Sequence, residues 1–259
     1  MSLIITNRKI SLLWLTMLVS LCYTSFSAQN SALFEQAKEQ YKAEKYQEAI
    51  SNWSKIVESG SHSAALYFNL GNAHYKLNQI GPSIYYYEKG LRLDPNYADI
   101  KNNLAFAQNA TIDAIEPLPE TVFSKWYKSI SGITNYNGWA ILSVSCSFAF
   151  VILFLLYYYS FSERRKRLLF VGSLLSLFLL LGAVVFAFKT YDDFTKDRPA
   201  IVFAESTEVK SEPSLGSAPA FTLHEGTKVQ ILQIEDEWLH IIIADGKEGW
   251  LPASDVKQL

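Results

Sequence analysis

Two long apolar runs separated by a short basic segment constrain this chain more than any other feature. Residues 138–159 and 168–188 contain no charged side chain. Each run is long enough for a helix that crosses the roughly 30 Å apolar core of a bilayer. The segment 160–167 between them carries four basic side chains. Because Lys and Arg resist translocation, we expect a transmembrane hairpin with a cytoplasmic basic loop and both flanking parts of the chain outside.

Residues 1–28 have the pattern of a secretory signal peptide. Arg8 and Lys9 precede an apolar stretch, and Ser25 and Ser27 supply small residues before a cleavage site at Ala28. An uncleaved anchor is the alternative. Both readings place the following part of the chain outside the membrane, because the two basic residues stay inside.

The segment 29–112 contains an internal repeat. Compared with itself at an offset of 34 residues, the chain aligns 30–63 with 64–97, and a partial third copy covers 98–110. A period of this length is typical of stacked helix pairs. We therefore predict an all-α repeat array in which the helix at 98–110 caps the second repeat.

The second repeat resembles the tetratricopeptide repeat family at Tyr67, Leu70, Gly71, Leu77, Ile80, Tyr87 and Pro95. The resemblance implies a concave groove that binds peptides or partner helices, lined by the first helix of each pair. In the family register, the groove residues are Phe34, Lys38, Tyr41, Asn69, Asn72, Tyr75, Lys76 and Asn102. Taken singly, each could equally be an ordinary solvated position. A clamp for a C-terminal carboxylate is not expected, because Phe34 and Asp99 stand where that clamp has Lys.

Residues 113–137 connect the array to the first apolar run. Two prolines stiffen the start of this linker, and apolar residues then recur at helical spacing beside Lys125 and Lys128. We expect a helix in the membrane interface; packing against the repeat array is the alternative. Neither apolar run contains a charged residue, His or Asn, so a transport path is not expected. Gly172, Ser173 and Ser176 offer a small-residue face for helix contact.

The pattern changes to β-strands in residues 199–259. Short runs rich in β-branched residues cover 200–203, 228–234 and 238–243, and Asp245-Gly246 is typical of a tight hairpin. This segment contains four basic and ten acidic residues, a balance of −6. Such an acidic module suits the solvent better than an anionic lipid surface. We predict a small all-β barrel.

This segment resembles the bacterial SH3 domain, most strongly in Gly249-Trp250-Leu251-Pro252 followed by Val256. The resemblance implies peptide or peptidoglycan ligands, and Trp238, Trp250 and Pro252 are the candidate cleft. Alternatively, Trp250 closes the core of the barrel. Asp255 occupies the region where eukaryotic relatives have a Tyr, so proline-rich ligands are not expected.

The residues that catalysis usually needs are scattered or missing. The four His are far apart, and no phosphate loop, dinucleotide fingerprint or Gly-x-Ser-x-Gly motif occurs. Cys22 and Cys146, the only cysteines, lie in the signal segment and in the first apolar run. The net charge of −2 gives no sign of a nucleic-acid partner. We expect a non-enzymatic interaction protein without catalytic residues, metal or cofactor.

The order of signal, repeat array, membrane hairpin and barrel is similar to that of the E proteins of the Bacteroides aerotolerance operons. The resemblance implies a multidomain protein of the bacterial inner membrane, with both outer domains in the periplasm. Because both domains leave the membrane from adjacent helices, we expect the hairpin to hold them side by side. The implied partners are membrane proteins with von Willebrand A domains and, indirectly, a MoxR-type AAA ATPase. The implied role is that of a scaffold in stress tolerance. A peptidoglycan-binding anchor that recruits a client and a sensor remain the alternatives.

Overall fold

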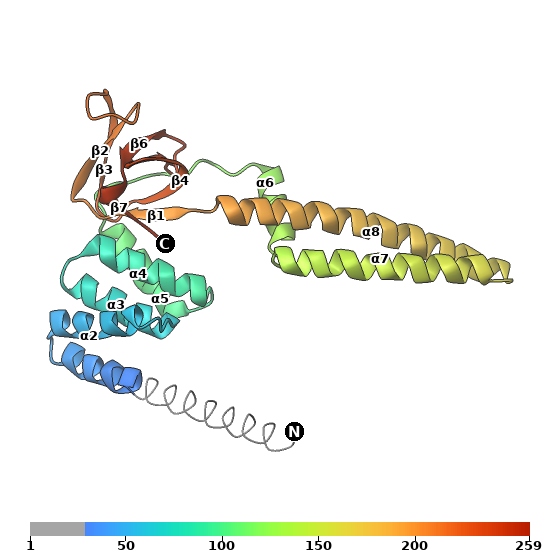
Figure 1. Cartoon of the computed structure of the whole chain (residues 1–259), viewed down its shortest axis with the longest axis horizontal. Helices are drawn as coiled ribbons and strands as arrows, with labels where there is room; N and C mark the ends of the chain where they lie inside the picture. Colours follow the sequence, from blue (N-terminus) through green and yellow to red (C-terminus); the bar gives the residue numbers. More distant parts are fainter. Residues whose placement is uncertain (1–28) are drawn as a thin grey trace, which may run out of the picture. The chain divides into compact units, whose positions relative to one another are not determined.

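The computed structural model describes residues 29–259, so the predicted signal peptide at 1–28 lies outside the described residues (Figure 1). The chain divides into two compact units. The first combines the part up to Ile115 with nearly all of the chain from Pro199 onward. The second consists of Glu116–Arg198 together with the turn Ala244–Gly246. The helical and β-sheet regions therefore belong to one unit.

The first unit begins with five helices in sequence. The chain is helical from residue 29 to residue 42, and α2 (Tyr46–Glu58), α3 (Ala64–Lys76), α4 (Ile80–Leu93) and α5 (Ala98–Asn109) follow. The turns that close the first two helix pairs contain Glu44 and Asn78, both with positive φ (61° and 57°). These two residues stand at equivalent positions of the aligned repeats, so the backbone repeats with the period seen in the sequence.

Small residues allow neighbouring helices of the array to approach closely. A Cβ at Gly71 of α3 would lie 2.5 Å from the ring of Tyr87 on α4. Ser83 of α4 is fully buried at the same contact, and its hydroxyl donates to the Gly71 carbonyl at 2.9 Å. Around Trp53 and Leu70, which are also fully buried, the first two pairs share one apolar cluster. Each pair thus covers the apolar face of the next.

The β-region is a seven-stranded antiparallel sheet with the order β3-β2-β6-β5-β4-β1-β7. Its strands are β1 (Pro199–Val202), β2 (Ser206–Lys210), β3 (Pro219–His224), β4 (Lys228–Glu235), β5 (Trp238–Ile242), β6 (Glu248–Pro252) and β7 (Val256–Gln258). A short 3-10 helix, Ala253–Asp255, precedes β7. Alternate residues of the strands form an apolar core that includes Val209, Ile241 and Leu251.

Strand β1 belongs to the sheet and to the core of the helical array. It pairs with β4 and β7, and its Val202 lies in the core of the sheet. Its Ile201 is fully buried in a cluster with Ile84 of α4 and Ile100 of α5. The two regions, which the sequence predicts to be held side by side by the hairpin, are therefore also joined directly through a shared hydrophobic core.

The second unit contains α6 (Val122–Ser131), α7 (Tyr136–Tyr159) and α8 (Glu163–Lys196). Two of these helices, α7 and α8, are long and apolar enough to cross a membrane. The basic residues expected in a loop at 160–167 instead form the first turns of α8, leaving Ser160–Ser162 outside the helices. Arg and Lys are good helix formers, and Glu163 in the first turn favours a helix start there. At its other end α8 continues beyond residue 188, the expected end of the span.

Helices α7 and α8 pack against each other along their length (Figure 1). Ser176 is buried, and its hydroxyl donates to the Cys146 carbonyl of α7 at 2.8 Å. Ser173 is also buried. The predicted small-residue face is therefore used inside the hairpin. Helix α6 packs on α8 within this unit, where the Tyr127 and Phe186 rings stack with centroids 6.1 Å apart.

Candidate functional site

The repeat array contains a hollow of about 260 Å³ on its surface. Helices α3, α4 and α5 contribute most of its wall, and the end of the first helix completes it. The lining residues are Tyr41, Asn72, Tyr75, Lys76, Tyr87, Asn103 and Phe106. The side chains of Tyr75 and Phe106 are large and aromatic, yet they are 39% and 66% exposed. A hollow with exposed aromatic side chains is typical of a surface that binds a partner.

Asn72 is the centre of the polar network in this hollow. Its Oδ1 atom accepts hydrogen bonds from the Tyr87 hydroxyl at 2.6 Å and from Asn103 Nδ2 at 2.7 Å. Three helices are thereby joined at one side-chain oxygen. Because both bonds end on Oδ1, the Nδ2 group of Asn72 has no partner among the described residues. An amide donor is thus left available to a ligand.

The titration state of Tyr87 supports this arrangement. Burial raises the pKa of Tyr87 to about 12, although hydrogen bonds to Ser83 and Asn103 oppose the shift. The phenol therefore keeps its proton at any physiological pH and acts as a donor to Asn72. Lys76 supplies the cationic group of the lining. The hollow thus offers an amide, a cation and aromatic surface, and no nucleophile activated by a base.

Four of the predicted groove residues line the hollow, and four do not. Those that line it are Tyr41, Asn72, Tyr75 and Lys76. Phe34 instead packs toward Trp53 with ring centroids 6.4 Å apart, and the Lys38 amine pairs with Glu35 at 2.9 Å. Asn69 is half-buried outside the lining, and Asn102 is exposed.

Asn103 and Phe106 replace Asn102 in the third copy of the repeat. An offset of 34 residues from Asn69 and Asn72 leads to Asn103 and Phe106, so a strict use of the repeat period identifies both. Asn102 is instead equivalent to Phe68, which packs against the array core. Asn102 therefore lies one position from Asn103, the residue of α5 that lines the hollow.

The predicted residues of the barrel lie on one outer face of the sheet. Trp238 pairs with Pro252, and Trp250 pairs with His240, so each pair points to the same side. The Trp250 and His240 rings stack with centroids 4.8 Å apart. Trp238, Trp250 and Pro252 are half-buried, and none belongs to the buried core cluster of the sheet. The alternative that Trp250 closes the core is therefore wrong, because Gly249 and Leu251 point inward in its place.

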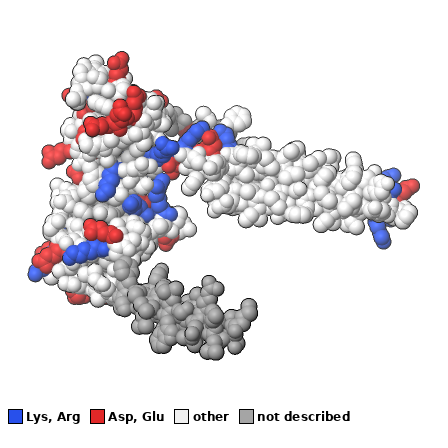
Figure 2. All heavy atoms as spheres, viewed as in Figure 1, with Lys and Arg blue, Asp and Glu red and all other residues white. Residues whose placement is uncertain are grey.

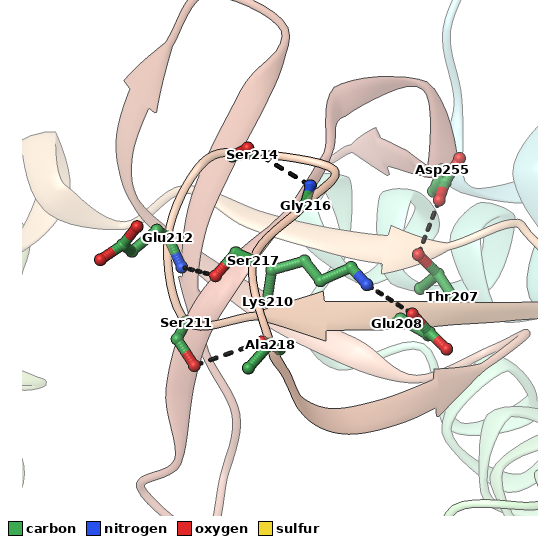
Figure 3. Close-up of polar contacts among 10 residues, drawn as sticks. All are labelled: Thr207, Glu208, Lys210, Ser211, Glu212, Ser214, Gly216, Ser217, Ala218 and Asp255. Atoms are coloured by element: carbon green, nitrogen blue, oxygen red, sulfur yellow. Dashed lines mark hydrogen bonds and ion pairs between the residues drawn. The ribbon is translucent and has the colours of Figure 1, made fainter.

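Polar contacts hold the loop beside this face (Figure 3). The Lys210 amine donates to Glu208 at 2.5 Å and is only 13% exposed as a side chain. The Glu212 amide donates to the Ser217 hydroxyl at 3.1 Å and closes the β2–β3 loop. Asp255 accepts from the Thr207 hydroxyl at 2.6 Å, so it ties the 3-10 helix to β2. Asp255 therefore has a structural role.

Polar contacts join the sheet to the array. Asp113 follows α5 and accepts from the His224 backbone N–H at 2.7 Å and from the Thr227 hydroxyl at 2.5 Å. Glu225 accepts from the Gly81 backbone N–H at 2.9 Å. The Lys228 amine lies 2.8 Å from Glu88, whose side chain is 13% exposed. These contacts fix the repeat hollow and the sheet within one unit.

A metal site does not form in the part of the chain that the structure describes. No group of three or more His, Cys, Asp and Glu side chains is placed to hold an ion there. Residues 1–28 are outside this statement.

Comparison with protein families places two parts of the chain. Residues 64–97 match the tetratricopeptide repeat, and residues 205–257 match the bacterial SH3 domain. No curated protein matches the chain. The chain thus contains a tetratricopeptide repeat of the type that mediates protein–protein interactions, two long apolar helices and a C-terminal bacterial SH3 domain.

Proposed function

We propose that this protein is a non-enzymatic scaffold of the bacterial inner membrane that binds partner proteins through the hollow of its repeat array. The observation that carries the proposal is the unpaired Asn72 amide beside the exposed rings of Tyr75 and Phe106. An amide donor can bind the carbonyl of an extended peptide, and the rings can cover its apolar side chains. Lys76 favours a peptide with an acidic residue.

The partner class follows from the resemblance to the aerotolerance operon E proteins, which rests on the order of the pieces. Membrane proteins with von Willebrand A domains are the proposed ligands of the array, in an assembly concerned with stress tolerance. A MoxR-type ATPase would act from the cytoplasm, where the loop of the hairpin and the start of α8 are the only proposed contact. Its role is therefore indirect.

The test is co-purification of the full chain with A-domain membrane proteins from the same envelope. We expect Tyr75→Ala with Phe106→Ala to reduce retention of the partner about tenfold, the loss typical of a large anchor residue. Lys101→Ala with Asn102→Ala is the matched control, because both residues are exposed on α5 and do not line the hollow. Equal retention by the two double variants at unchanged helicity would contradict the proposal.

A peptidoglycan-binding anchor is the second candidate, and the outer face of the sheet favours it. Trp238 and Trp250 present half-exposed indole faces, which suit stacking on sugar rings. Sedimentation with purified peptidoglycan tests this function. Binding that is lost in Trp238→Ala with Trp250→Ala, but kept in the repeat variant, would assign the wall contact to the sheet.

A further inference from the structure

The turn end of the α7–α8 hairpin contains a hollow that the proposed scaffold function does not use. Tyr157 from the last turn of α7 lines it together with Glu163, Lys166, Arg167 and Phe170 of α8. Its volume is about 390 Å³. Figure 2 shows charged side chains gathered at this end of the hairpin, next to the uncharged stretches 138–159 and 168–188.

The spacing of the α8 residues selects one face of the helix. Positions i, i+3, i+4 and i+7 lie along the same side of an α-helix, so these four side chains face Tyr157 of α7 together. Arg164 and Arg165 carry the same charge but fall on other faces and do not line the hollow. The hollow therefore depends on which basic residues share one helix face, and not only on the number of basic residues in the segment.

The charged groups in the hollow are available to a ligand. Among the described residues, no hydrogen bond or ion pair engages the charged ends of Glu163, Lys166 or Arg167. Two cations and one carboxylate give the lining a net charge of +1. The Tyr157 and Phe170 rings lie with centroids 5.6 Å apart and form an aromatic wall. A fitting ligand has one negative charge, a hydroxyl group and an apolar part.

We propose that this hollow binds the headgroup of an anionic phospholipid such as phosphatidylglycerol. Lys166 and Arg167 hold the phosphodiester, for which an Arg fork is well shaped. A headgroup hydroxyl donates to the Glu163 carboxylate, and Tyr157 with Phe170 packs against the glycerol and the start of the acyl chains. The site adjoins the end of the apolar run, the depth at which headgroups and aromatic belts lie. This inference rests on the proposed insertion of the hairpin into the membrane.

Phosphatidylethanolamine fits this hollow less well. Its ammonium group cancels the phosphate charge, so the net charge of +1 on the lining is left without a counterpart. The two lipids share a phosphodiester and differ in the group attached to it, since glycerol carries two hydroxyls and no charge whereas ethanolamine carries an ammonium group. Competition between them therefore tests whether the hollow prefers a headgroup with a net negative charge and a free hydroxyl.

The experiment uses the full chain reconstituted with equal amounts of the two lipids and measures retained lipid by native mass spectrometry. We expect preferential retention of phosphatidylglycerol, lowered about tenfold by Lys166→Gln with Arg167→Gln, since the variant removes the charge-assisted bonds to the phosphate. Arg164→Gln with Arg165→Gln is the matched control and should change retention less than about twofold. Equal losses in the two double variants, or equal retention of the two lipids, would overturn the site.

Insertion is measured on the same samples by resistance to alkaline extraction, and partner binding by the repeat hollow is measured separately. A chain that remains inserted but retains no phosphatidylglycerol overturns the lipid site and leaves the scaffold function standing. A chain that is fully extracted overturns the membrane hairpin and the lipid site together. Loss of partner binding alone affects only the scaffold function.

Discussion

Gly71 marks the closest approach between α3 and α4, and its substitution is the sharpest test of the array packing. A side chain at this position meets the Tyr87 ring, which is 1% exposed and held by Asn72. We expect Gly71→Leu to lower the free energy of unfolding by about 1–3 kcal/mol through overpacking. Denaturant unfolding followed by far-UV circular dichroism measures this. Ala105→Leu, at an exposed position of α5, should leave stability nearly unchanged; similar values for both variants would refute the close contact.

Asp113 makes the stability of the contact between the array and the sheet dependent on pH. Burial alone would raise the pKa of its carboxyl, but the bonds from Thr227 and from the backbone and ring of His224 outweigh it. The pKa of Asp113 therefore lies below its ordinary value of 3.8. A carboxyl group whose pKa is lower in the folded chain than in the unfolded chain stabilises the fold at pH values above its unfolded-state pKa. This stabilisation is lost as the pH falls through the folded-state pKa.

Asp113→Asn tests this linkage. We expect it to lower the free energy of unfolding at neutral pH by about 1–3 kcal/mol, because it removes a charged acceptor from three hydrogen-bond donors. The difference between wild type and variant should shrink below about pH 3.8. Unfolding curves recorded from pH 2.5 to 7 compare the two proteins directly. A difference that stays constant over this range would show that the Asp113 charge is unimportant.

The sequence predicts a residue of the hollow only where the repeat period determines its position on the helix. Tyr41 and Tyr75 are related by the period and lie in the lining, whereas the predicted Asn102 lies one position before Asn103, which lines the hollow. The hydrogen bond from Asn103 to Asn72 joins two residues that are 31 positions apart in the chain. Only the packing of α5 against α3 determines that contact, so periodicity alone could not reveal it.

At the scale of elements, β1 is the segment on which both regions of the first unit depend. Ile201 is fully buried among residues of α4 and α5, while the adjacent Val202 is fully buried in the core of the sheet. We expect Ile201→Ala to cost about 2–4 kcal/mol and to reduce amide protection in α4 and α5. Val202→Ala should reduce protection mainly in the sheet. Identical protection patterns, measured by hydrogen exchange, would contradict a division of β1 between two cores.

The elements that escaped prediction have weak apolar patterns. In β2, only Thr207 and Val209 are buried, and β3 begins with Pro219 and has a single buried residue. The sequence runs that predict strands are more apolar, since all four residues of β1 are buried and β5 contains Trp238, Leu239, Ile241 and Ile242. The extension of α8 was missed for a related reason, because Lys189 ends the apolar run while the helix continues through polar residues.

At the scale of the whole molecule, the proposed topology makes a direct prediction. In a chain without Cys22 and Cys146, cysteines placed at the exposed positions Asn109 and Leu215 should react with an impermeant thiol reagent once the outer membrane is permeabilised. Ser162→Cys, between α7 and α8, should be protected in the same cells. Labelling of position 162 alone would show that the topology is the opposite of the proposed one. Lysed cells, in which all three positions should react, provide the control.

The junction between the array and the sheet lay beyond prediction because its partners are remote in the chain. The contact between Asp113 and His224 spans 111 positions, and that between Gly81 and Glu225 spans 144. The apolar helices occupy much of the intervening sequence. The sequence around each of these residues is like that around any solvent-exposed residue. The local sequence therefore does not distinguish an acidic residue that joins two regions from one that faces the solvent.

The shared core around Ile201 also has a consequence for the order of biosynthesis. The ribosome makes Ile84 and Ile100 long before Ile201, and both apolar helices emerge in between. At typical elongation rates, the about 120 residues that separate Ile84 from Ile201 take roughly 6–24 s to synthesise. During this interval the nascent repeat array exposes an apolar patch to its surroundings. With the proposed topology, in which both regions are exported, we expect periplasmic holding chaperones to bind this chain until β1 is exported.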